Sequence, residues 1–226
     1  MKSKSFKFKV MIFAVLSLIV AGIVVNSAIK NRNIIKINNK NQEIKKQKLK
    51  GNEDKKQQQV KKKQEELEKK WKIGYDQFFE KKYEKAIETE RQVLKEDPSF
   101  YKAYAVEGIA LAYNGNFNAG MQQIDKALKL KPSYGYARFN KALANELYGH
   151  YDEAIKWYEK DLEVENFEWS YYGIASIYGR KGDTSNAVKY LKLAIDINPN
   201  VKTEAKGEED FDKVRENKEF KQLIEK

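Results

Sequence analysis

A repeat of 34 residues runs through the C-terminal two-thirds of the chain and constrains its fold more than any other feature. Small residues recur with spacings of 34, 34 and 33 residues, at Gly74, Gly108, Ala142 and Ala175. Two further series keep the same spacings, one of small residues and one mostly of proline: Ala86, Gly120, Ala154 and Ala187, and Pro98, Pro132, Asn166 and Pro199. Three series in one register predict stacked units, because one such unit cannot bury its apolar face alone.

Each unit is predicted to contain two helices joined by a short turn. Gly115, Gly149 and Gly182 stand at the expected turns. The two small series let the helices of a unit approach closely, and the proline ends the second helix because it cannot continue the hydrogen-bond ladder. The pattern therefore favours an all-α fold.

The fourth unit shows the pattern most fully, as Tyr171-x2-Ile174-Ala175-x2-Tyr178, then Ala187-x3-Leu191, then Pro199. This resembles the tetratricopeptide repeat, and the N-terminal part described below is similar to that of bacterial members with a membrane anchor. The resemblance implies an α-solenoid of four repeats over 67–200, at about 67–100, 101–134, 135–167 and 168–201. Residues 201–226 are expected to form a C-terminal cap with an apolar face, made by Phe211, Val214, Phe220, Leu223 and Ile224.

One junction departs from the repeat pattern. A third small position reads Val93, Ala127, Asp161 and Ala194, so that a carboxylate replaces an apolar side chain in the third repeat. The proline at the end of that repeat is replaced by Asn166. We expect altered packing between the third and fourth repeats, with Asp161 facing either a hydrogen-bond partner or solvent.

The excess of basic residues lies in the N-terminal third of the chain. Residues 1–70 carry a net charge of +13 and residues 71–226 a net charge of −2. A basic head, 1–9, precedes an apolar segment, 10–29, which contains no charged residue. About 20 apolar residues span a bilayer core, so this segment is either a single-pass transmembrane helix or a signal peptide cleaved near Ser27. We expect a cell-membrane protein with the repeats outside the cytoplasm, or a secreted one.

Residues 30–66 are dominated by Lys, Gln, Asn and Glu and are expected to form a charged tether, disordered or partly helical. Basic residues beside a membrane attract anionic headgroups, but an AT-rich genome also produces such a composition. We do not expect nucleic acid as a partner, because no aromatic residue interrupts the charges from Arg32 to Lys70.

The resemblance also implies a concave groove lined by the first helix of each repeat. Carried over position by position, the groove residues are Trp71, Tyr75, Phe78, Phe79, Lys102, Ile109, Tyr113, Tyr136, Phe139, Asn140, Leu143, Glu146, Trp169, Tyr172, Ser176 and Arg180. Asn140 stands where family members often hold the backbone of a ligand, although the other repeats lack asparagine there. Such an aromatic surface is suited to binding, and aromatic residues at helical spacing are equally typical of packing.

Enzyme, cofactor and metal sites are not expected. The chain has no Cys and one His, His150, which lies at a predicted turn. Gly115-x4-Gly120 lacks the Lys-Ser/Thr of a phosphate loop, since Met121-Gln122 follows it. The sequence predicts a membrane-anchored scaffold that binds a peptide or helix of a partner protein. The alternatives are a secreted adaptor, and a module that binds lipid headgroups or wall polymers through its tether.

Overall fold

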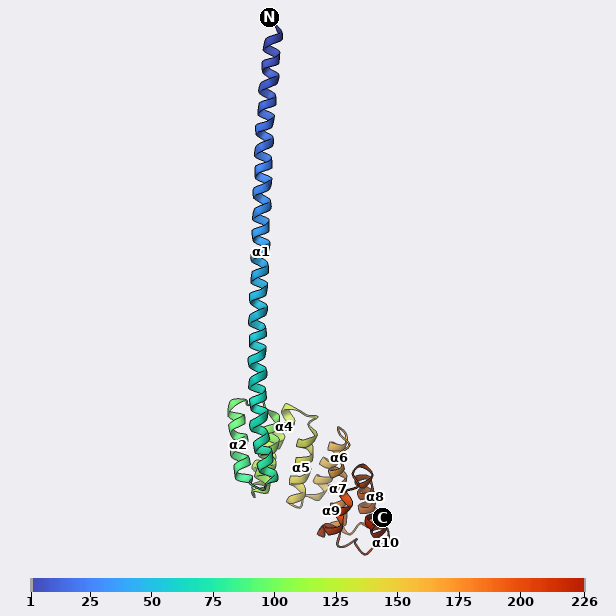
Figure 1. Ribbon diagram of the computed structural model, residues 1–226. Coiled ribbons are helices and arrows are strands. Elements are labelled where there is room, and N and C mark those ends of the chain that lie inside the picture. Colours follow the sequence, from blue (N-terminus) through green and yellow to red (C-terminus); the bar gives the residue numbers. More distant parts are fainter. Residues whose placement is uncertain (1, 226) are drawn as a thin grey trace. The chain divides into compact units, whose positions relative to one another are not determined.

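The structure, a computed structural model, describes the backbone of residues 2–225; the side chains of residues 2–10, 12–20, 37, 41, 44, 47–49 and 52 lie outside the description. It divides into two units, Met1–Gln64 and Glu65–Lys226, which are treated separately below. The elements, shown in Figure 1, are α1 (Lys2–Phe79), α2 (Tyr83–Glu96), α3 (Tyr101–Tyr113), α4 (Phe117–Leu130), α5 (Gly135–Leu147), α6 (Tyr151–Leu162), α7 (Glu168–Lys181), α8 (Thr184–Ile197), α9 (Val201–Gly207), the 3₁₀ turn η1 (Glu209–Phe211) and α10 (Lys218–Glu225).

The first unit is helical from residue 2 onward. Helix continues through the predicted tether, 30–66, where the sequence led us to expect coil in part. Lys, Glu and Gln have high helix propensity, and no proline precedes Pro98. Among the residues that the structure describes, no helix combines the length and apolar character needed to cross a membrane. Most of the N-terminal half of the predicted membrane segment, 10–29, lies outside the described side chains.

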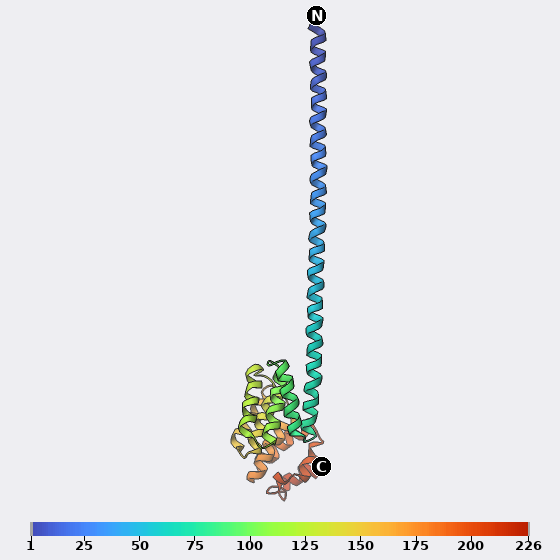
Figure 2. The same ribbon diagram turned by 90° about the vertical axis from the view of Figure 1, so that its left-hand side faces the viewer.

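The second unit is a series of antiparallel helix pairs that follow one another in chain order (Figures 1 and 2). Contacts within pairs join α3 to α4, α5 to α6 and α7 to α8, and contacts between pairs join α2 to α3, α4 to α5 and α6 to α7. In the first repeat, Leu67 of α1 is buried against Val93 of α2. This nesting is the arrangement that the 34-residue spacing predicts.

Small residues bring the helices of a pair together, as expected. A Cβ added at Gly108 would lie 2.8 Å from the carbonyl oxygen of Gly120, and one added at Gly120 would lie 2.6 Å from the carbonyl oxygen of Gly108. Both distances are shorter than any ordinary contact, so the backbones of α3 and α4 meet directly. The equivalent positions Ala142 and Ala154 in the third repeat are fully buried.

The turns within the repeats share one conformation. Gly115, Gly149 and Gly182 have φ angles of 86°, 77° and 75°, in the left-handed region that favours glycine. The first repeat places Lys81 there, with φ of 60°. The residue after each turn donates its N–H to the carbonyl five positions earlier, as Lys82 does to Gln77 at 2.9 Å. The first repeat thus adopts the shared turn without the residue best suited to it.

The end of the array is covered by the chain that follows α8. Phe211, Val214, Phe220 and Ile224 join one buried cluster with Leu191 of α8, and Leu223 packs against it. α9 and α10 both contact α8, at the C-terminal end of the array in Figure 1. These are the residues whose spacing predicted an apolar face, and their burial removes the exposed end that a helical repeat array would otherwise have.

Two carboxyl groups are buried at positions where other repeats have apolar side chains. Asp161 is fully buried and accepts a hydrogen bond of 2.6 Å from Ser170 Oγ, which confirms the expected partner. Glu90 is also fully buried, at the position held by Ile124, Tyr158 and Leu191 in the other repeats. Neither oxygen of Glu90 has a hydrogen-bond partner among the described residues. A Cβ at Gly74 would collide with this carboxyl group, so the missing side chain makes room for it.

Candidate binding surface

We use the term groove surface for the predicted groove residues on α1, α3, α5 and α7. In the first three repeats a connected set of aromatic rings forms much of it: Trp71, Tyr75, Phe78, Phe79, Tyr113 and Tyr136. The ring of Tyr75 lies 5.4 Å from that of Trp71, 4.7 Å from that of Phe79 and 5.6 Å from that of Tyr136, centroid to centroid. Tyr75 and Tyr136 belong to the first and third repeats, so the rings connect these repeats across α3.

Small residues on α3 explain this contact between non-adjacent repeats. Ala105 is fully buried, and Tyr136 packs against the cluster to which Ala105 belongs. A larger side chain at residue 105 would hold the rings of the first and third repeats apart. The sequence indicated the aromatic positions, but the convergence of Tyr75 and Tyr136 depends on how tightly the repeats curve around α3.

A second branch of rings lies toward the turns of the first two repeats. Phe78 lies 5.5 Å from Tyr113, edge to face, and 5.2 Å from Phe79. Edge-to-face pairs of this kind add about 0.5–1.5 kcal/mol beyond the area they bury. Phe79 remains 60% exposed, so the groove surface has an open aromatic end in the first repeat.

Lys102 and Lys72 both place positive charge on these rings, Lys72 over the ring of Tyr75. The contacts of Lys102 are the more extensive. Its Nζ lies 4.9 Å from the centre of the Trp71 ring and 2.9 Å from both carboxylate oxygens of Glu68. The ammonium group is thereby held over the indole face by a cation–π contact and by an ion pair. These contacts fix the orientation of the Trp71 ring, and the side chains of Lys102 and Glu68 are partly buried.

Three predicted groove residues are buried and do not reach the surface: Ile109, Asn140 and Ser176. Ile109 is fully inaccessible and packs in a cluster with Ile124. Asn140 is 1% exposed, and its Nδ2 donates to the carbonyl oxygen of Ala105 at 3.4 Å. The reason is that α3 and α5 approach closely through small side chains, which places Ile109 and Asn140 inside the stack. Asn140 therefore bonds the array to itself rather than standing free for a ligand backbone.

The other third-repeat positions are partly buried. Phe139 packs between Tyr158 and Phe167, with ring centroids 5.6 Å and 5.1 Å away. Leu143 packs at the edge of the cluster that contains Ile109. Both side chains contribute to the joint between repeats, and only part of each faces outward.

Glu146 links the third repeat to the fourth. It accepts hydrogen bonds from Tyr158 OH at 2.6 Å and from Ser176 Oγ at 3.1 Å. Burial raises the pKa of the Glu146 carboxyl above its usual value, and these two hydrogen bonds oppose the shift. The carboxyl is therefore part of an interior network and not a solvated surface charge.

In the fourth repeat the groove surface is covered by the C-terminal segment. Arg180 Nε lies 2.7 Å from Asp210 Oδ1, and Ser176 Oγ donates to Asp210 Oδ2. Tyr172 lies 5.4 Å from Trp169 and 5.7 Å from Phe211, edge to face in both cases. Sequence reasoning placed Phe211 in the cap but missed that Asp210 and Phe211 would meet the predicted groove residues of α7.

Nε1 of Trp71 and the hydroxyl group of Tyr172 are buried and have no hydrogen-bond partner among the described residues. Burial raises the pKa of the Tyr172 hydroxyl group. Burial also raises the pKa of the Tyr136 hydroxyl group, and a hydrogen bond from the Asn140 side chain opposes this shift. Unpaired buried donors are rare in folded proteins and each one costs free energy.

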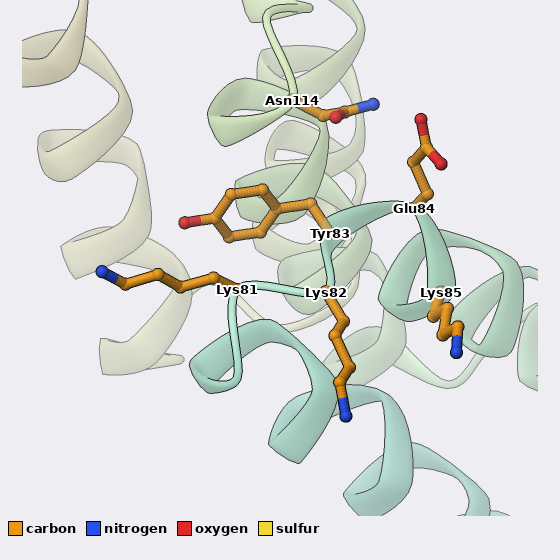
Figure 3. Close-up of a pocket in the computed structure, with 6 residues that line it drawn as sticks. All are labelled: Lys81, Lys82, Tyr83, Glu84, Lys85 and Asn114. Atoms are coloured by element: carbon orange, nitrogen blue, oxygen red, sulfur yellow. The ribbon is translucent and has the colours of Figure 1, made fainter.

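A hollow of about 280 Å³ lies outside the groove surface, at the turn that precedes α2. It is lined by Lys81, Lys82, Tyr83, Glu84, Lys85 and Asn114. The lysine side chains point in different directions (Figure 3). Their ammonium groups do not converge on one point, so this hollow has no arrangement for holding an anion.

Comparison with known proteins agrees with the helix pairs. Models of the tetratricopeptide repeat match residues 105–162 and 170–201. Tetratricopeptide repeat protein 4 of Homo sapiens is 32% identical over 96 residues, which cover 41% of this chain and 25% of that protein. An uncharacterized protein of Methanocaldococcus jannaschii is 33% identical over 72 residues, which cover 32% of this chain and 79% of that one.

A solved structure is also similar. The crystal structure of MamA aligns with a TM-score of 0.50 and 27% identity, covering 62% of this chain and 81% of that one. The chain spans only 24–33% of the length of the first curated relatives that it matches. The matched segments, the shared turn conformation and the nested helix pairs show that this chain belongs to the tetratricopeptide repeat proteins.

Proposed function

We propose that this chain is a scaffold that binds a segment of a partner protein on its groove surface. Tetratricopeptide repeat proteins are in general scaffolds for protein–protein interactions. The observation that carries the proposal for this surface is the run of rings Trp71, Tyr75 and Phe79, whose outer end is 60% exposed. A bound segment would pack its side chains against these rings.

The open part of the groove surface is suited to this role. Trp71, Tyr75, Phe79 and Tyr136 offer large rigid contact areas at a low cost in side-chain entropy. Lys102 adds a positive charge beside the indole. The preferred ligand is accordingly a segment with apolar side chains for the rings and a carbonyl or carboxylate acceptor for the Lys102 ammonium group, which only donates.

The experiment truncates the exposed ring of the groove surface. Phe79→Ala in the full chain is compared with wild type by affinity capture and quantitative mass spectrometry. Truncating a ring that contacts a partner costs about 1 kcal/mol or more, so we expect recovery of specific partners to fall at least about fivefold. Leu130→Ala is the matched control, since Leu130 is also partly exposed, at 46%, and lies on α4 outside the groove surface. Equal recovery by all variants would count against the proposal.

We further propose that residues 10–29 anchor the chain in the cell membrane, with the repeats outside the cytoplasm. The uncharged apolar sequence between two basic stretches supports this. Membrane fractionation with intact-mass measurement tests it. Full-length mass in the membrane fraction and digestion of the repeats by external protease are expected. Loss of about 27 residues, with release of the chain, would indicate a cleaved signal peptide.

A further inference from the structure

The segment from Glu208 to Asp212 lies on the fourth repeat in the manner of a bound peptide. Asp210 accepts hydrogen bonds from Ser176 and forms an ion pair of 2.7 Å with Arg180, which is 42% exposed. Arg180 and Ser176 both stand at positions that the repeat pattern assigns to ligand binding. The site therefore already contains one cationic group and one hydroxyl donor directed at a carboxylate.

The backbone and the ring of this segment also fit α7 closely. A Cβ at Gly179 would lie 2.7 Å from the carbonyl oxygen of Asp210 and 2.8 Å from Cδ1 of Phe211. Only a glycine at residue 179 leaves room for this approach. Phe211 is fully buried and faces Tyr172. The face of α7 thus accommodates an acidic residue followed by an aromatic one.

The charges around the segment extend the site beyond this pair. A hollow of about 570 Å³ is lined by Tyr151, Arg180, Lys181, Glu209, Asp210, Asp212 and Lys213. It combines cationic side chains of α7 with acidic side chains of the segment. Asp210 lies in the middle of η1, a 3₁₀ turn of three residues, so only a short segment holds it in place.

Building on the proposed function, we propose that residues 208–212 are an internal occupant of a binding site on α7, and that a partner segment with an acidic residue followed by an aromatic residue takes their place. The structure assigns the chemistry of this partner through Asp210 and Phe211, which show what the site accepts. The fourth repeat is closed while the internal segment is bound and becomes available when a competing segment displaces it. This gives the scaffold a second point of contact, separate from the open rings of the first three repeats.

The test uses a fluorescent peptide of residues 206–214 as the probe and the full chain in detergent. Asp210→Asn weakens the internal ion pair, and we expect it to raise probe affinity at least tenfold over wild type. Asp196→Asn is the matched control, because it makes the same charge change at an exposed position of α8, outside the segment and the hollow. Adding Arg180→Gln to Asp210→Asn removes the cation of the site and is expected to abolish the gain.

Probe peptides with the aspartate or the phenylalanine replaced by alanine should bind at least tenfold more weakly. Equal probe affinity for the Asp210→Asn and Asp196→Asn chains would overturn the proposal, and circular dichroism confirms that both are folded. Should Asp210→Asn fail to fold, Arg215→Gln makes the same test, because Arg215 donates to the carbonyl oxygen of Glu208 at 2.6 Å and so holds the segment without changing α7. A concentration-dependent dimer of the wild-type chain that the probe dissociates would assign the site to a second copy and overturn the partner assignment. Unchanged partner recovery with Phe79→Ala would instead count against the proposed function alone.

Discussion

The groove surface differs between the first repeat and the fourth. In the first repeat the rings end at Phe79, which is 60% exposed. In the fourth, Phe211 from the C-terminal segment is fully buried against the same type of surface. Trp71 and Tyr172 stand at equivalent positions of the two repeats, yet only Tyr172 is covered by the C-terminal segment. The comparison teaches that the repeat pattern specifies which side chains line the surface, while the segments outside the repeats govern its access.

The largest effect is expected from truncating the covered ring. Phe211→Ala removes a fully buried aromatic side chain and should lower the free energy of unfolding by about 3–5 kcal/mol. Phe79→Ala at the open end should change it by less than about 0.5 kcal/mol, because that ring is mostly exposed already. Chemical denaturation of the full chain measures both. Similar losses for the two variants would contradict the contrast between the two ends.

The unpaired carboxyl of the first repeat is expected to make stability depend on pH. Burial, with a smaller contribution from Glu107, raises the pKa of Glu90 to about 9. The folded state therefore binds a proton that the unfolded state releases between pH 4.5 and 9. The contribution of Glu90 to the free energy of unfolding is therefore greatest below pH 4.5. It declines as pH rises toward 9, by up to about 1.4 kcal/mol per pH unit.

Glu90→Gln removes this titration and should flatten the profile, with a gain on the order of 2 kcal/mol at pH 8. Denaturation midpoints measured from pH 4 to pH 9 check this. Glu88→Gln, at an exposed position of the same helix, is the control and should leave the slope unchanged. A wild-type stability that stays level across this range would show that Glu90 is ionised in the folded state.

The partnered carboxyl of the third repeat should give a smaller effect in a narrower window. Burial raises the pKa of Asp161 to about 7, opposed by the hydrogen bond from Ser170 and aided by the nearby Glu165. Stability from this group is full below about pH 4 and is lost as pH rises to about 7. Asp161→Asn, which keeps an acceptor for Ser170, should gain on the order of 1 kcal/mol at pH 8. A loss of stability at pH 8 would show that the ionised form is the favoured one.

The smallest effect concerns the turn of the first repeat. Lys81→Gly supplies the residue that the other three turns have, and should raise the free energy of unfolding by about 0.5–1 kcal/mol. The reverse change, Gly149→Lys, should lower it by a similar amount. Thermal melts by circular dichroism resolve such differences. A lower free energy of unfolding for Lys81→Gly, or a higher one for Gly149→Lys, would indicate that Lys81 is not strained at its φ of 60°.

The spacing of small residues, turn glycines and prolines was sufficient to predict the helix pairs, their order and the burial of Ala142 and Ala154. These are local properties, since a left-handed turn or a close helix contact accepts few residue types. The same spacing predicted a buried position at Asp161, and the chemistry of a buried carboxylate predicted its need for a partner.

The exposure of each groove residue, by contrast, depends on contacts between segments far apart in the chain. Ile109 and Asn140 occupy groove positions in the sequence, but the close approach of α3 and α5 buries both. Tyr75 meets Tyr136 because Ala105 lies between their repeats, and Arg180 is paired because the chain returns over α7 after α9. Helical periodicity tells which face a side chain occupies, but what covers that face depends on how distant segments pack, which no local pattern encodes.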